Sequence, residues 1–249
     1  MTPPRFDALA PHYAWIEAAS FGGLLQWCRT ALVEDLADAR RVLILGEGDG
    51  RFVRAFLAHN PAARVHVVDV SPTMVALARR RAGSGCGCGS GCGSGPGRER
   101  VTWQVADARA VEYPRAEYDL IVTNFFLDCF GPDDLARLIP RVAVALQPGG
   151  RWLVGDFRVP PGRLAGAASR VLLAAMYGFF RLTTRLPASR LVDPRPLLLA
   201  RGLTPLRAES RLGGFLTSEL WSSPPAPSTP IHREERSALH DEGPEHPWR

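Results

Sequence analysis

The stretch Arg41-Val-Leu-Ile-Leu-Gly-Glu-Gly-Asp-Gly-Arg51 decides the fold of this chain. Its four apolar residues, 42–45, predict a strand that is buried on both faces of a parallel sheet. The glycines at 46, 48 and 50 permit a sharp turn and let a ligand approach the backbone. The helix predicted from residue 52 to 59 then directs its free N–H groups at that ligand. The stretch therefore predicts a strand, a ligand-binding turn and a helix.

A second predicted strand, Arg64-Val-His-Val-Val-Asp69, ends on a carboxylate. Asp69 follows the glycine turn by about 20 residues, which is the separation of a ribose-binding acid in a βαβ unit. Ser71 and Pro72 predict the N-cap and the first residue of the next helix, which leaves Asp69 free for a ligand. A dinucleotide-binding turn would read G-x-G-x-x-G, with a glycine where this chain has Arg51. The spacing therefore disfavours NAD.

With these features the chain resembles the class I S-adenosylmethionine-dependent methyltransferases over roughly residues 40 to 156. Tyr118-Asp-Leu-Ile-Val-Thr-Asn124 resembles the fourth strand of that family, and Leu146-Gln-Pro-Gly-Gly-Arg-Trp-Leu-Val154 resembles the turn into the fifth. The opening Phe6-Asp-Ala-Leu-Ala-Pro-His-Tyr13 is similar to that of the small-molecule group of ubiquinone and menaquinone synthesis. The resemblance implies an α/β fold: a Rossmann-like, seven-stranded, mostly parallel sheet with helices on both faces and a C-terminal antiparallel hairpin.

The resemblance also implies S-adenosyl-L-methionine as cofactor and a set of residues around it. The glycine turn passes beneath the methionine part, Asp69 holds both ribose hydroxyls, and Asp107 lies beside the adenine amine. The implied cofactor-binding residues are Tyr13, Gly46, Glu47, Gly48, Gly50, Asp69, Val70, Asp107, Ala108 and Asn124. Many family members carry an acid two residues before the first glycine, where this chain has Ile44. Glu47 or a water molecule is then the alternative partner for the methionine amine.

The chain divides into an N-terminal helical arm (1–38), a methyltransferase domain (39–221) and a disordered tail (222–249), which is rich in Pro, Ser and charge. The Gly/Cys-rich insertion 83–97 contains C-x-C-x3-C. We expect no metal there, because ordering a glycine chain around three thiolates is entropically costly. Residues 160–190 predict a lid-like helical region whose Leu and Phe side chains cover a small apolar or aromatic acceptor. The segment 203–221 predicts the closing hairpin.

Composition limits the partners of this chain. All 30 basic residues are Arg and they are scattered, so the net charge of +5 does not indicate nucleic-acid binding. No signal pattern and no apolar run of about 20 residues is present, and we expect a cytoplasmic protein. Arg residues flank the apolar segment 164–186, which leaves peripheral membrane contact open.

The catalytic residues and the function have several interpretations. Asp128 and His12 are candidate bases and Tyr177 a candidate orienting group, but methyl transfer requires no fixed triad, so the sequence selects none of them. The leading hypothesis is a methyltransferase acting on a small, apolar or aromatic molecule. The alternatives are an inactive cofactor-binding scaffold or regulator, an NAD-type dehydrogenase, and a nucleic-acid methyltransferase.

Overall fold

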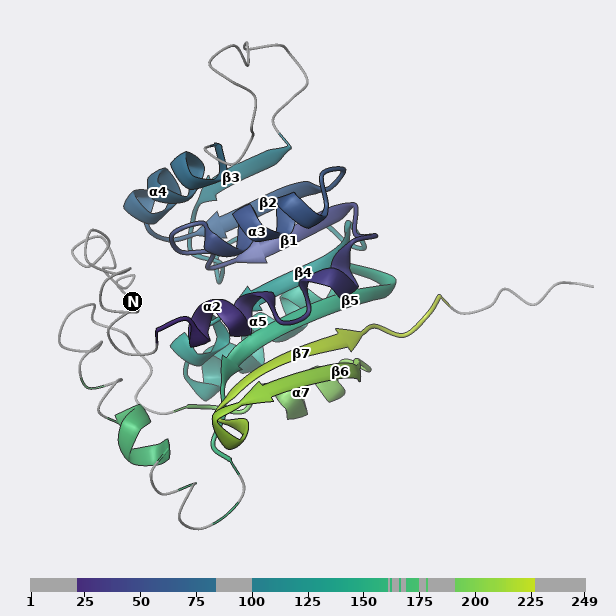
Figure 1. Cartoon of the computed structure of the whole chain (residues 1–249). Helices are drawn as coiled ribbons and strands as arrows, with labels where there is room; N and C mark the ends of the chain where they lie inside the picture. Colours follow the sequence, from purple (N-terminus) through teal and green to yellow (C-terminus); the bar gives the residue numbers. More distant parts are fainter. Residues whose placement is uncertain are drawn as a thin grey trace, which may run out of the picture.

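The computed structural model describes residues 22–83, 100–160, 162, 166, 169–174, 178 and 191–226. Its centre is a seven-stranded sheet with the order β3-β2-β1-β4-β5-β7-β6 (Figure 1). Strands β1 to β5 are parallel, and β7 runs antiparallel to both β5 and β6. The predicted fold class is therefore confirmed. The strands are β1 Arg41–Leu45, β2 Arg64–Asp69, β3 Val101–Val105, β4 Tyr118–Asn124, β5 Leu146–Phe157, β6 Thr204–Arg211 and β7 Leu216–Ser222.

Helices cover both faces of the sheet, with α2, α3 and α4 on one side and α5 and α7 on the other (Figure 1). Their bounds are α2 Leu24–Thr30, η1 Val33–Leu36, α3 Arg51–His59, α4 Pro72–Gly83, η2 Leu127–Cys129, α5 Pro132–Ala143, α7 Arg195–Leu199 and η3 Leu212–Gly214.

The alternation of side chains along β1 explains the two hydrophobic cores. Val42 and Ile44 pack with α3 and η1, whereas Leu43 and Leu45 pack with α5 and α7. All four side chains are 1% exposed or less. Successive strand residues point to opposite faces, so a continuous apolar run is what a strand covered on both sides requires.

The start of the fifth strand differs from the prediction. Helix α5 ends at Ala143, and Gln147-Pro-Gly-Gly150, which we expected to form a turn, lies within β5. Leu146 pairs with Tyr118, and the register between β4 and β5 then shifts before Leu120 pairs with Arg151. The Pro-Gly-Gly segment is therefore accommodated as an irregularity of the ladder, which is where strand Pro and Gly are tolerated.

Several predicted features lie outside the described residues. These are residues 1–21 of the arm with His12 and Tyr13, most of the Gly/Cys-rich insertion, Tyr177 and Phe179 of the lid-like region, and the tail from residue 227. In the described part of the arm, α2 and η1 are helical as expected. Among the residues that the structure describes, no helix is long and apolar enough to cross a bilayer.

Candidate cofactor site

The turn from β1 into α3 takes its shape from its three glycines, whose φ angles are +66°, +69° and +86°. A Cβ atom on Gly46 would lie 2.3 Å from the Phe126 ring, and one on Gly50 would lie 2.6 Å from the Cα atom of Ala78. Among the residues that the structure describes, none has an atom within 4 Å of the equivalent position on Gly48. Gly46 and Gly50 are thus required for packing, while the backbone at Gly48 remains open to a ligand.

Asp69 connects this turn to the end of β2. Its Oδ2 atom accepts a hydrogen bond from the Gly48 N–H at 3.0 Å, and its Oδ1 atom accepts one from the Ser71 N–H at 2.9 Å. Ser71 caps α4 as predicted, because its Oγ atom accepts from the Met74 N–H. The carboxylate is therefore not free, contrary to our expectation. A carboxylate has about four lone-pair sites, so these two hydrogen bonds do not by themselves exclude ribose hydroxyls as further donors.

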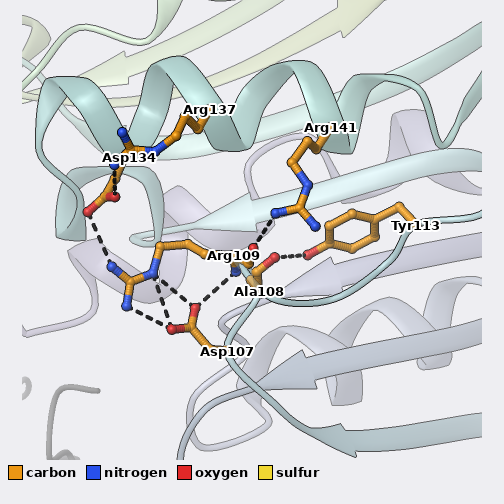
Figure 2. Close-up of polar contacts among 7 residues, drawn as sticks. All are labelled: Asp107, Ala108, Arg109, Tyr113, Asp134, Arg137 and Arg141. Atoms are coloured by element: carbon orange, nitrogen blue, oxygen red, sulfur yellow. Dashed lines mark hydrogen bonds and ion pairs between the residues drawn. The ribbon is translucent and has the colours of Figure 1, made fainter. Parts of the chain in front are cut away.

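The second predicted acid, Asp107, is fixed by its neighbour Arg109 (Figure 2). The Arg109 Nε and Nη2 atoms and its backbone N–H all donate to the Asp107 carboxylate, at 2.7–3.2 Å. These hydrogen bonds lower the pKa of Asp107 below its usual value. Asp107 therefore presents an ionised, oriented acceptor, which suits an amine donor such as that of adenine.

Arg109 also ties this acceptor to α5, as Figure 2 shows. Its Nη1 atom donates to Asp134 at 3.2 Å, and Asp134 also pairs with Arg137. On the other side of the same loop, the carbonyl of Ala108 accepts the Tyr113 hydroxyl at 2.8 Å. Arg109 was not predicted as a site residue. The signal for it was the Asp-x-Arg spacing together with an acid in the first turn of α5.

An aromatic wall leads from Asp107 back to the glycine turn. The Arg109 guanidinium carbon lies 5.8 Å from the centre of the Phe130 ring, and Phe130 meets Phe126 edge-on at 5.0 Å. Phe126 in turn packs against Gly46. Val70, which follows Asp69, is half-buried. The predicted ribose and adenine residues therefore share one edge of the sheet, where the parallel strands end.

Glu47 is buried in the turn and caps the next helix. Its Oε1 atom accepts the Val53 N–H at 3.0 Å, in the first turn of α3. Burial raises the pKa of Glu47 to about 8, and the nearby Arg29 partly offsets this. Arg29 comes from α2, is 6% exposed and stacks over Phe125 at 5.1 Å. Arg29 was not predicted, because only the fold brings α2 to this turn.

Asn124, at the end of β4, carries an unsatisfied buried amide. It is 8% exposed, and within the part of the chain that the structure describes neither Oδ1 nor Nδ2 has a hydrogen-bond partner. An unpaired buried polar group costs about 1–3 kcal/mol. Gly155 on β5 makes room for this amide, since a Cβ atom there would lie 2.4 Å from Oδ1. The orphaned amide and the open backbone at Gly48 both fit a cofactor with hydrogen-bonding groups.

A pair of buried acids lies near Asn124 in the fold, since Asp128 follows it in the next turn and Asp156 follows Gly155, its strand partner. The Asp156 Oδ2 atom, at the end of β5, accepts the Asp128 N–H at 3.2 Å, and Asp128 also contacts the thiol of Cys129. Burial raises the pKa of both carboxyls, and repulsion from Asp128 raises that of Asp156 further. The pair therefore retains a proton at a pH where isolated carboxyls have lost theirs. Asp128 was a predicted candidate base, whereas Asp156 was missed.

Comparison with known proteins identifies the family. A model described as a methyltransferase domain matches residues 42–150. The demethylmenaquinone methyltransferase of Thermus thermophilus is 31% identical over 176 residues, which are 70% of this chain and 74% of that protein. The enzyme of the same name from Deinococcus radiodurans is 28% identical over 87% of this chain and 89% of its own length.

Solved structures agree on the fold. The N-methyltransferase NodS of Bradyrhizobium japonicum superposes with a TM-score of 0.54 at 16% identity, over 80% of this chain and 97% of its own. The 1,6-didemethyltoxoflavin N1-methyltransferase of Burkholderia thailandensis was solved with S-adenosylhomocysteine. It superposes with a TM-score of 0.55 at 20% identity, over 90% of this chain and 92% of its own. The sheet and these likenesses define a Rossmann-like methyltransferase fold. The chain belongs to the class I S-adenosylmethionine-dependent methyltransferases of the ubiquinone and menaquinone type, and it methylates a small molecule.

We expect Arg109 to govern how well the site distinguishes adenine from its deaminated form. Asp107 accepts from the adenine amine in the implied arrangement, and hypoxanthine has a carbonyl there. In Arg109→Met, the preference for S-adenosylhomocysteine over S-inosylhomocysteine should fall about fivefold, the equivalent of one hydrogen bond. Calorimetric titration measures both affinities. Arg137→Met is the control, because Arg137 bonds Asp134 but not Asp107. An equal preference in all three proteins would contradict this role.

We expect the ligand-free enzyme to lose stability as the pH rises from 5 to 8. Between about 4.5 and 8 the folded state holds a proton on Glu47 that the unfolded state has released, so the free energy of unfolding falls with rising pH. Glu47→Gln should reduce this slope while keeping the cap on Val53. Thermal unfolding at several pH values measures this slope, since a change of about 1 kcal/mol in the free energy of unfolding shifts the unfolding temperature by about 2–4 °C. The buried Asp128–Asp156 pair acts in the same direction in both proteins, so an unchanged slope in the variant would refute the assignment to Glu47.

Proposed function

We propose that this enzyme methylates an apolar, aromatic acceptor of the quinone-precursor type at the carboxyl ends of β4 and β5. The two relatives described above are named for demethylmenaquinone, and this supports an acceptor with a similar ring. The cofactor residues in the proposal are those implied by the resemblance, from Gly46 to Asn124. Tyr13 remains in the proposal as an expectation outside the described residues.

An aromatic cluster at the carboxyl ends of β4 and β5 carries this proposal. Phe125 follows Asn124, Phe157 ends β5, and Phe215 precedes β7. The ring centres of Phe125 and Phe157 are 5.1 Å apart, and those of Phe157 and Phe215 are 5.3 Å apart. Phe125 is only half-buried and has a φ angle of +50°, which is a strained conformation for a residue other than glycine. Strain of this kind is concentrated at binding sites, and aromatic walls suit flat apolar ligands.

The acid pair Asp128–Asp156 is the proton acceptor in this proposal, and Asp156 directly precedes Phe157 in β5. In methylation at a ring carbon, the electron pair of the ring forms the new C–CH3 bond as the S–CH3 bond of the cofactor breaks. The ring then loses a proton. A carboxyl pair that holds one proton and one negative charge can accept the released proton, because its pKa values are raised.

The lid-like region 160–190 belongs to this proposal in a modified form. We expected the Leu side chains of this region to cover the acceptor, but Leu172 is 46% exposed. Leu173 is buried, and it packs with Phe157 and Phe215. Leu173 therefore extends the aromatic cluster, and Leu172 with Val171 offers an apolar surface for peripheral contact with a membrane that holds a lipophilic acceptor. A cytoplasmic location is consistent with such contact.

Asp69→Ala should abolish cofactor binding without unfolding the protein. The substitution removes the proposed ribose acceptor and frees the Gly48 N–H, so we expect the affinity for S-adenosylmethionine to fall at least about 100-fold, as for the loss of two charge-assisted hydrogen bonds. Asp119→Ala is the matched control, since Asp119 also accepts two backbone N–H groups, of Arg40 and Arg41, at the opposite end of β1. Calorimetry that shows equal losses in both variants would sink the assignment.

Phe125→Leu should impair acceptor use and spare the cofactor. Removing the ring takes away a stacking surface, and we expect kcat/KM for a demethylated naphthoquinol to fall about tenfold. The dissociation constant of S-adenosylhomocysteine should change less than about twofold. Leu206→Ala, on the exposed face of β6, is the control. Binding of the cofactor by the wild type with no transfer to any acceptor in a cell extract would instead favour the scaffold alternative.

A further inference from the structure

The apolar residue at position 44 leaves the amino-acid end of the cofactor without the acid that many relatives have. Ile44 is 1% exposed and packs in the core formed with α3 and η1. It lies two residues before Gly46, in register with Val122 of β4. An ammonium group at this edge of the sheet therefore needs a partner from another element, since a buried cation requires a paired charge or hydrogen bonds.

Asn124 is the polar residue that ends the neighbouring strand. Val122 shares the core of Ile44, and Asn124 lies two residues further along β4, so its side chain is on the same face of the sheet. Its two amide atoms are buried and lack partners among the described residues. A buried amide that is otherwise unpaired indicates a ligand with both a donor and an acceptor. The ammonium and carboxylate of an amino acid are such a pair.

Two buried ionisable side chains, an acid and a guanidinium, belong to segments next to Gly46 and Asn124. Glu47 belongs to the glycine turn, directly after Gly46, and the Arg29 guanidinium covers the ring of Phe125, the residue that follows Asn124. Glu47 and Arg29 are near enough to influence each other electrostatically. Glu47, once an ammonium group draws off its proton, complements that ammonium, and the guanidinium complements a carboxylate.

We propose that Asn124, flanked by Glu47 and Arg29, receives the amino-acid end of S-adenosylmethionine in place of the acid that Ile44 displaces. The proposal rests on the proposed cofactor site. Gly155 is part of the same arrangement, because only a residue without Cβ leaves the Asn124 amide in its position. Asn124 is thus a binding residue for one end of the cofactor and is separate from Asp69 and Asp107, which serve the ribose and the adenine.

The test compares two ligands that differ only at that end. S-adenosylhomocysteine carries the amino acid, and 5′-methylthioadenosine has the same nucleoside and sulfur without it. In Asn124→Leu we expect calorimetry to show a loss of affinity of at least about tenfold for S-adenosylhomocysteine and less than about twofold for 5′-methylthioadenosine. The ligand-free variant should unfold at the same temperature as the wild type or higher, because an unpaired buried amide has been removed.

Two further variants keep the result unambiguous. Gly155→Ala retains Asn124 but displaces its amide, so it should show the same selective loss even if Asn124→Leu does not fold. Asn60→Leu is the matched control: Asn60 is a buried amide that donates to the carbonyls of Leu36 and Ala39. Its replacement should lower the unfolding temperature and leave the affinity ratio of the two ligands unchanged.

The outcomes separate this inference from the proposed function. Equal losses for both ligands in Asn124→Leu and Gly155→Ala, or no loss for either, would overturn the role of Asn124 while leaving the cofactor site in place. Failure of the folded wild type to bind either ligand would overturn the cofactor site and the inference together.

Discussion

The hydrogen bonds that the Asp69 carboxylate accepts from the backbone N–H groups of Gly48 and Ser71 are the contacts on which the rest of the site depends. They join the turn after β1 to the turn after β2, and these two turns lead into α3 and α4. The helices themselves meet where Gly50 approaches Ala78, at a distance that leaves no room for a side chain. One carboxylate and one glycine thus fix both loops that must enclose a nucleoside. A site preorganised in this way loses little conformational entropy when its ligand binds.

Buried charge at the same edge of the sheet gives the site its electrostatic character. Glu47, Asp128 and Asp156 are all buried, and burial raises the pKa of each. A carboxyl group taken out of water takes up a proton unless a cation compensates it. Arg29 provides part of that compensation from α2. A ligand that carries a sulfonium and an ammonium adds positive charge where the protein has an excess of acid, so its binding and the ionisation of these carboxyls favour each other.

The sequence was sufficient for elements whose pattern has one physical solution. The bounds of β2 match the prediction to the residue, since an apolar run ending on a polar residue fits a parallel strand that stops at the sheet edge. The bounds of β4 match those that the family resemblance implies. The sequence was not sufficient where one segment can adopt two backbone conformations. Gln147-Pro-Gly-Gly150 is typical of a turn, but in the structure it joins β5 through a register shift. Arg29 and Arg109 were also not predicted from the sequence. Arg29 of α2 contacts Phe125, which follows β4, and Arg109 pairs with Asp134 of α5. Charged residues reveal their partners only once the chain is folded.

Ile44 stands where many relatives carry an acid, and this changes which residues stabilise the fold and which bind the ligand. An acid buried at that position would weaken the core in the absence of ligand, whereas Ile44 completes it. The polar function moves to Asn124, which is neutral, so its desolvation is less costly than that of a carboxylate. Its unpaired amide still destabilises the ligand-free protein, and this deficit is recovered when a ligand satisfies it. Ligand binding is therefore strengthened by the Asn124 amide, which the fold holds in place without giving it a hydrogen-bond partner among the described residues. The core around Ile44 stays well packed when no ligand is bound.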